Sequence, residues 1–252
     1  MKQTRVLMGM PITVEIVDAK ATAATFDTVF EYFRYVDETF STYKDTSEIT
    51  AINKGVLPQE QWSADMKLVF ALAEKTRVET NGFFDIRTAG DRYDPSGIVK
   101  GWAIWKAAEI LKNDGFENFY IDAGGDIQPH GLNAKRKKWA VGIKNPWNEQ
   151  ENVKIVHVTT EGVATSGTYI RGHHIYDPKH GNRPVDEIVS LTVIGPNIYE
   201  ADRFATAAFA MGREAINFIE HLDGFEGYMI DKEKTATLTS GFERYTIPGI
   251  KK

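Results

Sequence analysis

A row of large apolar side chains between Ala21 and Phe40 limits the folds that are open to this chain. The side chains recur at steps of three and four residues, which places them on one face of a helix. They are Phe26, Val29, Phe30, Phe33, Val36 and Phe40. A helical face of this kind is normally buried, so we interpret the row as part of a core and assign it no function.

Helical and extended patterns alternate along the rest of the chain. Further helices are predicted after a capping box at 45–48 (ending near Gly55) and at 63–81, 102–111, 199–211 and 213–222. Strands are predicted at 12–17, 119–123, 139–143, 153–159, 190–195, 227–230 and 235–238. We find no internal repeat and no linker, and therefore expect a single domain over residues 1–252.

Composition excludes several classes of protein. The 252 residues carry 30 basic and 35 acidic side chains and a formal charge of −5, which gives no reason to expect a nucleic-acid partner. The chain has no cysteine, which rules out disulfides, thiolate metal sites, a cysteine nucleophile and a lipid-modified cysteine. No apolar run is long enough for a signal peptide or a membrane span, so we expect a cytoplasmic protein that does not insert into a membrane.

The segment Asp94–Gly101 combines a carboxylate, two glycines and a lysine just before the predicted helix at 102–111. We expect a tight turn here, whose glycines let backbone groups approach a ligand while Lys100 and the helix N-terminus supply positive charge. The spacing is not that of a phosphate-binding loop. From local sequence alone, a turn that only caps a surface helix is the simpler interpretation.

Asp202 and Thr206 are four residues apart in a predicted helix, so their oxygens share one face. One carboxylate and one hydroxyl form a sparse oxygen set of the kind that holds magnesium when phosphate oxygens and water complete the coordination. The alternative is that Asp202 caps its helix and Thr206 packs, and spacing alone favours that alternative.

Other polar side chains fit known sites poorly. Ser166 does not lie in the Gly-x-Ser-x-Gly turn of serine hydrolases. The spacing of His173, His174 and His180 matches no zinc pattern.

Eight short motifs occur in the order seen in the FAD:protein FMN transferase (ApbE) family, which this chain resembles from residue 8 to residue 212. They are Met8-Gly9-Met10, Phe40-Ser41-Thr42-Tyr43, Phe84-Asp85, the segment 94–101, Asp122-Ala123-Gly124-Gly125-Asp126-Ile127, Ala164-Thr165-Ser166-Gly167, the segment 174–181 and Asp202-Arg203-Phe204-Ala205-Thr206. Each motif is weak alone, but eight in register are specific.

The resemblance implies an enzyme that splits FAD and transfers FMN to a Thr or Ser hydroxyl of an acceptor flavoprotein, releasing AMP, with Mg²⁺ on the pyrophosphate. It implies that Asp202, Thr206 and the backbone carbonyl of Gly97 bind the metal. His174 matches the proposed general base, a role that suits an imidazole titrating near neutrality. A structural role for His174 before the turn at Asp177 is the alternative.

The resemblance also implies an FAD site. Its lining matches Met8, Tyr43, Phe83, Phe84, Asp85, Asp94, Lys100 and Ile175. Tyr43 is the expected stacking partner of a flat ring. Lys100 can meet phosphate and Asp94 can accept from ribose or adenine donors, and the sequence leaves these roles open. Thr165, Ser166 and Asp126 lie in matching motifs and are secondary candidates, since such side chains often bond only to the backbone.

Three departures from the family pattern are visible. The connection between Asp85 and Asp94 is short where many relatives carry a long insertion, Asp94-Pro95-Ser96-Gly97 replaces the more usual Asp-Leu-Gly-Gly, and there is no export signal. The short connection leaves the identity of the acceptor open. Two alternatives also stay open: an FAD hydrolase that produces FMN and AMP, and a protein that binds FAD without turnover.

We therefore expect an α+β fold of two closely packed lobes, in which helices cover a mostly antiparallel sheet and the site lies between the lobes.

Overall fold

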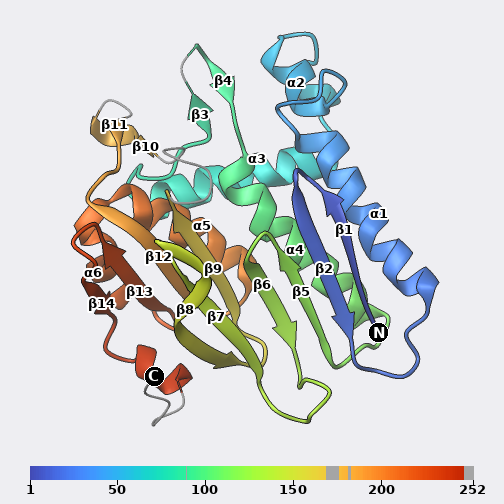
Figure 1. Cartoon of the computed structure of the whole chain (residues 1–252). Helices are drawn as coiled ribbons and strands as arrows, with labels where there is room; N and C mark the ends of the chain where they lie inside the picture. Colours follow the sequence, from blue (N-terminus) through green and yellow to red (C-terminus); the bar gives the residue numbers. More distant parts are fainter. Residues whose placement is uncertain (89, 169–175, 181–182, 247–252) are drawn as a thin grey trace.

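A computed structural model of the chain describes residues 1–88, 90–168, 176–180 and 183–246. The fold is built on an eight-stranded antiparallel sheet with the strand order β1-β2-β5-β6-β9-β12-β13-β14 (Figure 1). These strands are β1 Lys2–Leu7, β2 Met10–Ile16, β5 Phe119–Ala123, β6 Asp126–His130, β9 Gly162–Gly167, β12 Ile188–Gly195, β13 Glu226–Asp231 and β14 Ala236–Leu238. The expected α+β class and antiparallel sheet are confirmed.

Separate two-stranded pairs outside the large sheet complete the β structure. The long hairpin β7–β8 joins Trp139–Asn145 to Asn148–Val158 and forms its own two-stranded sheet. Two smaller pairs are β3 Arg87–Thr88 with β4 Arg92–Tyr93, and β10 Tyr176–Asp177 with β11 Arg183–Pro184. The β3–β4 pair occupies the short connection before Asp94.

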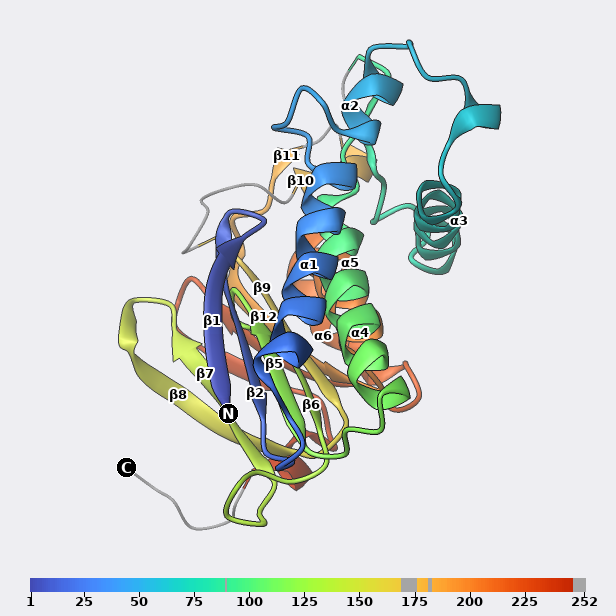
Figure 2. The same ribbon diagram turned by 90° about the vertical axis from the view of Figure 1, so that its right-hand side faces the viewer.

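The helices are α1 Ala23–Phe40, α2 Glu48–Asn53, α3 Ala64–Glu79, α4 Ser96–Asn113, α5 Ile198–Ala210 and α6 Ala215–Glu220. Short 3₁₀ turns lie at Gln59–Gln61, Pro178–His180, Gly212–Glu214 and Phe242–Tyr245. Figure 2 shows α1, α4 and α5 on one side of the large sheet and the β7–β8 hairpin on the other, with α3 outside the helical layer. The sheet is therefore covered on both faces.

Two hydrophobic clusters correspond to these two faces. The larger one contains the apolar row of α1, all of it buried, together with Ile12, Val14 and Ile16 of β2. The smaller one joins the β7–β8 hairpin to the opposite face of the sheet. In β12, Val193 belongs to the first cluster and its neighbour Ile194 to the second, as expected for alternate residues of a strand.

Turns with positive φ shape the sheet near the motifs. Met8 and Gly9 have φ of 53° and 72° and connect β1 to β2, which fits the two-residue hairpin turn in which both central residues adopt positive φ. Gly124 and Gly125 have φ of 62° and 96° and connect β5 to β6 in the same way. This turn makes Asp126 the first residue of a strand that we did not predict.

The main correction concerns α4, which begins at Ser96 and not at Trp102. The Asp94 carboxylate accepts the Ser96 N–H at 3.0 Å, and the Pro95 carbonyl accepts the N–H groups of Ile98 and Val99. These contacts satisfy donors at the helix N-terminus and start the helix six residues early. Gly97 and Lys100 are thus helical residues rather than turn residues.

Smaller differences affect other element ends. Ser47, and not Asp45, caps α2 by accepting the Thr50 N–H at 3.2 Å, while Asp45 forms an ion pair with Lys54. The strand β1 was not predicted, β8 begins at Asn148 rather than 153, and the helix predicted at 213–222 is divided into a 3₁₀ turn and α6. In the part of the chain that the structure describes, no helix is long and apolar enough to cross a membrane.

Candidate active site

The site is organised by the contact between α4 and α5. A Cβ atom on Gly101 would lie 2.5 Å from Asp202 Cβ and 2.9 Å from the Ile198 carbonyl oxygen, so only glycine allows the helices to approach this closely. The Gly101 N–H donates to Asp202 Oδ2 at 2.7 Å, and Asp202 is 3% exposed. The helix contact therefore places a buried carboxylate beside the first turns of α4.

The same hydrogen bond affects Gly97. In a regular α-helix the Gly101 N–H would donate to the carbonyl four residues earlier, which is that of Gly97. The Asp202 carboxylate competes for this donor. The competition leaves capacity on the Gly97 carbonyl oxygen to bind a cation.

Gly97, Thr206 and Phe84 meet on the same side of α4. A Cβ on Gly97 would lie 3.2 Å from Thr206 Cγ2 and 3.3 Å from Phe84 Cε2. Among the residues that the structure describes, the Thr206 hydroxyl has no hydrogen-bond partner, and Thr206 is only partly buried. Three residues that we proposed from sequence are thus close together, with one hydroxyl available to a ligand.

Lys100 lies between two buried carboxylates. Its Nζ is 2.6 Å from Asp126 Oδ2 and 3.7 Å from Asp202 Oδ1. The other oxygen of Asp126, Oδ1, accepts the Thr165 N–H at 3.0 Å, and Asp126 is 1% exposed. The Lys100 side chain keeps 22% of its surface exposed, so the ammonium borders the site and also balances its carboxylates.

Burial raises the pKa of the Asp202 carboxyl to about 7, with a further upward contribution from the negative charge of Asp126. The Lys100 ammonium and the Gly101 N–H oppose this increase because they stabilise the carboxylate. A cation bound next to Asp202 would therefore stabilise its ionised form.

The donor set fits a hard divalent cation. Asp202 can supply a carboxylate, Gly97 a carbonyl whose regular helical donor also donates to Asp202, and Thr206 a hydroxyl, and Mg²⁺ prefers oxygen ligands. No group of three or more His, Asp or Glu side chains suited to a metal occurs among the described residues. Such a sparse set matches Mg²⁺, which keeps several waters or phosphate oxygens, better than an all-protein calcium or zinc site.

A cleft of about 380 Å³ lies beside the start of α4, between α2 and the β3–β4 hairpin. Asp94, Thr42 and Arg92 contribute to its lining. Tyr43, next to Thr42, is 98% exposed, so its ring is accessible to a ligand. Met8 lies partly buried in the β1–β2 turn.

Phe83 and Asp85 follow α3. The Lys179 ammonium lies 4.9 Å from the centre of the Phe83 ring, which connects this segment to the 3₁₀ turn at Pro178–His180. Asp85 accepts the Arg87 N–H at 2.8 Å. Phe84 is 4% exposed and its ring packs on Gly97. Phe84 therefore helps to hold the start of α4 in place.

The remaining candidates divide into two groups. His173, His174 and Ile175 lie outside the described residues. Thr165 and Ser166 lie in β9, where the Thr165 hydroxyl bonds to that of Thr192 at 2.8 Å and Ser166 is 7% exposed.

Comparison with known proteins decides the family. The model of the ApbE family matches residues 8–91 and 87–229, which is most of the chain. The chain belongs to the ApbE family. This confirms the resemblance inferred from the eight motifs.

Curated ApbE relatives carry the name FAD:protein FMN transferase. The relative from Klebsiella pneumoniae is 31% identical over 149 residues, which are 56% of this chain and 43% of the relative. The relative from Vibrio cholerae is 35% identical over 130 residues, 48% of this chain and 39% of the relative. The matched region thus spans less than half the length of these relatives.

Solved ApbE structures share the whole fold. The flavin transferase ApbE from Vibrio cholerae has a TM-score of 0.84 and 23% identity, covering 97% of this chain and 98% of the other. The ApbE protein from Thermotoga maritima has a TM-score of 0.86 and 19% identity, covering 98% and 99%. The eight-stranded sheet and its helices therefore form an ApbE fold.

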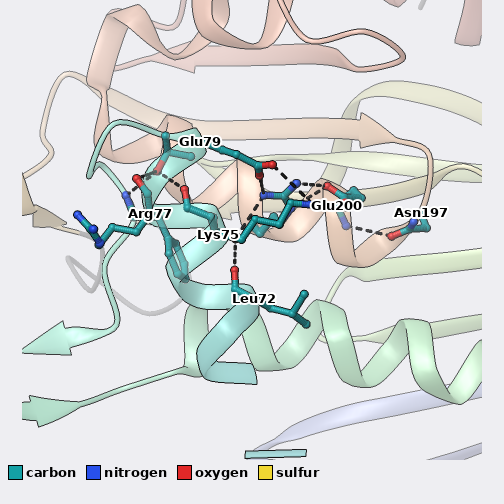
Figure 3. Close-up of polar contacts among 10 residues, drawn as sticks. Leu72, Lys75, Arg77, Glu79, Asn197 and Glu200 are labelled. Carbon is teal, nitrogen blue, oxygen red and sulfur yellow. Dashed lines mark hydrogen bonds and ion pairs between the residues drawn. The ribbon is translucent and has the colours of Figure 1, made fainter. Parts of the chain in front are cut away.

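The Arg203 cluster is one feature of this ApbE chain that sequence reasoning missed. Arg203 Nε donates to Glu200 at 2.7 Å, and its Nη1 bonds to Glu79 and, at 3.3 Å, to Thr76. Figure 3 shows Glu79 and Glu200 approaching each other from α3 and α5. The cluster joins α3 to the helix that carries Asp202; the adjacent position of Arg203 in the motif was the available signal.

Proposed function

We propose that this protein is a magnesium-dependent flavin transferase that moves FMN from FAD to a Thr or Ser hydroxyl of an acceptor protein and releases AMP. The proposal extends over residues 1–252 as one transferase domain. Family membership supports the reaction class, and the names of the curated relatives support FAD as the substrate. The observation that carries the chemistry is the convergence of Asp202, Thr206 and Gly97 at the α4–α5 contact.

Asp202, Thr206 and the Gly97 carbonyl are the groups that would hold Mg²⁺. When bound, the ion would neutralise charge on the pyrophosphate of FAD. Lys100 places a second positive charge at the border of the same site, 3.7 Å from Asp202. A ligand with several negative charges is the kind of molecule that such an arrangement attracts.

The transfer is a displacement at phosphorus. The acceptor hydroxyl oxygen forms a bond to the phosphorus of the FMN half, the pyrophosphate P–O bond breaks, and AMP leaves with the bridging oxygen. We assign removal of the hydroxyl proton to His174, since its imidazole can accept a proton near neutral pH.

The remaining residues of the proposed FAD site surround the start of α4. Asp94 and Lys100 belong to that helix start, Phe84 packs on Gly97, and the cleft of about 380 Å³ is adjacent. Tyr43 offers an exposed ring for stacking on a flat ligand. Met8, Phe83, Asp85 and Ile175 complete the proposed set.

The test is mass spectrometry of an acceptor with an Asp-x-x-Thr-Gly-Ala-Thr target, incubated with the protein, FAD and Mg²⁺. We expect one FMN on the target threonine, lost on chelation of Mg²⁺ and in Asp202→Asn, and retained in Asp27→Asn. Asp27 is the control because it lies on α1 and forms a surface ion pair with Arg5 of β1, whereas Asp202 lies on α5. Conversion of FAD to FMN and AMP without modification would favour a hydrolase, and intact bound FAD a storage protein.

A further inference from the structure

We propose that Asp126 is a positioning residue for the metal site: it holds the Lys100 ammonium away from Asp202, so that the Asp202 carboxylate is open to a divalent cation. This inference rests on the proposed function. Asp126 contributes no ligand itself in this proposal, since its two oxygens are engaged by Thr165 and Lys100.

The distances carry the inference. Lys100 Nζ lies 2.6 Å from Asp126 Oδ2 and 3.7 Å from Asp202 Oδ1, so the ammonium forms the closer ion pair with Asp126 and the longer one with Asp202. A closer approach to Asp202 would place the positive charge where the cation must bind. The pair with Asp126 prevents that while leaving the ammonium close enough to attract an anionic ligand.

Asp126 is itself fixed in place. It is the first residue of β6, after the Gly124-Gly125 turn, and is 1% exposed. Its Oδ1 accepts the Thr165 N–H of β9 at 3.0 Å, which orients Oδ2 toward Lys100. A buried carboxylate held on two sides can impose a position on a flexible lysine side chain.

Asp126→Asn tests the positioning role, because asparagine keeps the size and shape of the side chain and removes only its negative charge. The amide oxygen can still accept the Thr165 N–H, but an amide NH₂ then faces the ammonium, and two donors repel. The Lys100 ammonium is then expected to move closer to Asp202, with which it already forms a longer ion pair, and the site also loses one negative charge. Both effects weaken cation binding.

The matched control is Asp122→Asn. Asp122 lies at the other end of the same turn, where Oδ1 accepts the Gly125 N–H at 2.9 Å, and the residue is half-buried. The two variants remove the same charge from the same hairpin. Only Asp126→Asn removes a carboxylate that pairs with Lys100.

The experiment measures binding of Mn²⁺, as a spectroscopic substitute for Mg²⁺, to the full chain without FAD, by electron paramagnetic resonance of the free ion. Loss of a partner that orients metal ligands typically costs about 10- to 100-fold in affinity, and we expect that range for Asp126→Asn. We expect a smaller loss, below about threefold, for Asp122→Asn, because its carboxylate accepts the Gly125 N–H rather than pairing with Lys100. Lys100→Met combined with Asp126→Asn should recover part of the lost affinity, since no ammonium remains to occupy Asp202.

Thermal unfolding of each variant verifies that it is folded. Equal losses of affinity in Asp126→Asn and Asp122→Asn, or no recovery in the double variant, would overturn the positioning role while leaving the proposed function intact. Failure of the wild-type protein to bind Mn²⁺ would overturn the metal assignment of the proposed function, and this inference with it.

Discussion

The Gly101 N–H donates to Asp202 Oδ2 at 2.7 Å across residues that are 101 positions apart in the chain. This hydrogen bond requires close approach of α4 and α5, which a Cβ on Gly101 would prevent. The same N–H is the regular helical donor to the Gly97 carbonyl, so the Asp202 carboxylate competes with that carbonyl for it. One backbone group thus connects helix packing to the oxygen set of the proposed metal site.

Gly101→Ala should damage both stability and metal binding. The new Cβ would lie 2.5 Å from Asp202 Cβ, and overpacking of this kind typically costs about 1–3 kcal/mol. Gly97→Ala provides the comparison, because its contacts of 3.2 and 3.3 Å are milder and alanine favours helix by about 1 kcal/mol. Urea unfolding of both variants measures the difference; an equal loss of free energy of unfolding would contradict the packing argument.

Asp202→Asn should lower metal-dependent turnover by more than about 100-fold, since even outer partners of metal ligands cost 10- to 100-fold. The amide oxygen can still accept the Gly101 N–H, and no charge is buried, so thermal stability should be retained. FAD binding should survive in part. Steady-state kinetics, together with flavin fluorescence titration, measure the two effects, and full activity would remove Asp202 from the metal site.

Metal affinity should depend on pH through Asp202. Burial raises its pKa to about 7, so a proton competes with the metal below that pH. Apparent affinity should fall by up to about tenfold for each pH unit below 7 and level off above it. Because the folded pKa is raised, the metal-free protein should lose stability as pH rises from about 4, the unfolded pKa, to about 7.

The measurement is the increase in melting temperature caused by Mg²⁺ at pH 6 and at pH 8. We expect a larger increase at pH 8, and a small, pH-independent one in Asp202→Asn. An increase in the wild-type protein that is the same at both values would contradict the titration of Asp202.

Arg203→Met should destabilise the fold without weakening metal binding. Its guanidinium is buried between Glu79 and Glu200, and loss of one partner of a buried ion pair costs about 3–5 kcal/mol. The two carboxylates are 36% and 23% exposed, so solvent reduces the expected cost to about 2 kcal/mol. Arg213→Met, at an exposed pair with Glu233, should cost below about 1 kcal/mol in the same denaturant series.

His174→Ala should keep FAD affinity and lose turnover, because the proposed base contacts the acceptor hydroxyl rather than FAD. Fluorescence titration of FAD and FMN transfer to the acceptor give the two quantities. An unchanged transfer rate would return His174 to the structural role before Asp177.

Sequence reasoning predicted the elements whose patterns are local. The apolar row of α1 and the alternating strand β2 were found because their side chains repeat with the period of the element. The start of α4 was missed because the Asp94 carboxylate moves the helix start ahead of the apolar run. Ile98 and Val99 in this first part of α4 are buried as well, so the feature that sequence reasoning missed was the Asp94 cap.

The candidate site was predictable only in part, for a related reason. Asp202, Thr206 and Gly97 could be proposed from motifs, and Gly97 and Thr206 do lie together. The pairing of Lys100 with Asp126 depends on the β5–β6 turn and on β9, which place a distant carboxylate beside α4. A contact that arises from sheet order has no local signature.

The pairing of β2 with β5 joins Ile12 to Ala123, across a long intervening chain. Contacts between distant residues slow folding because loop-closure entropy is lost before they form. The carboxylate, hydroxyl and carbonyl of the proposed metal site can converge only after α5 has docked on α4, so we expect a newly made chain to bind a divalent cation only once that contact has formed. Acquisition of metal binding during refolding should therefore follow the recovery of helical structure in time.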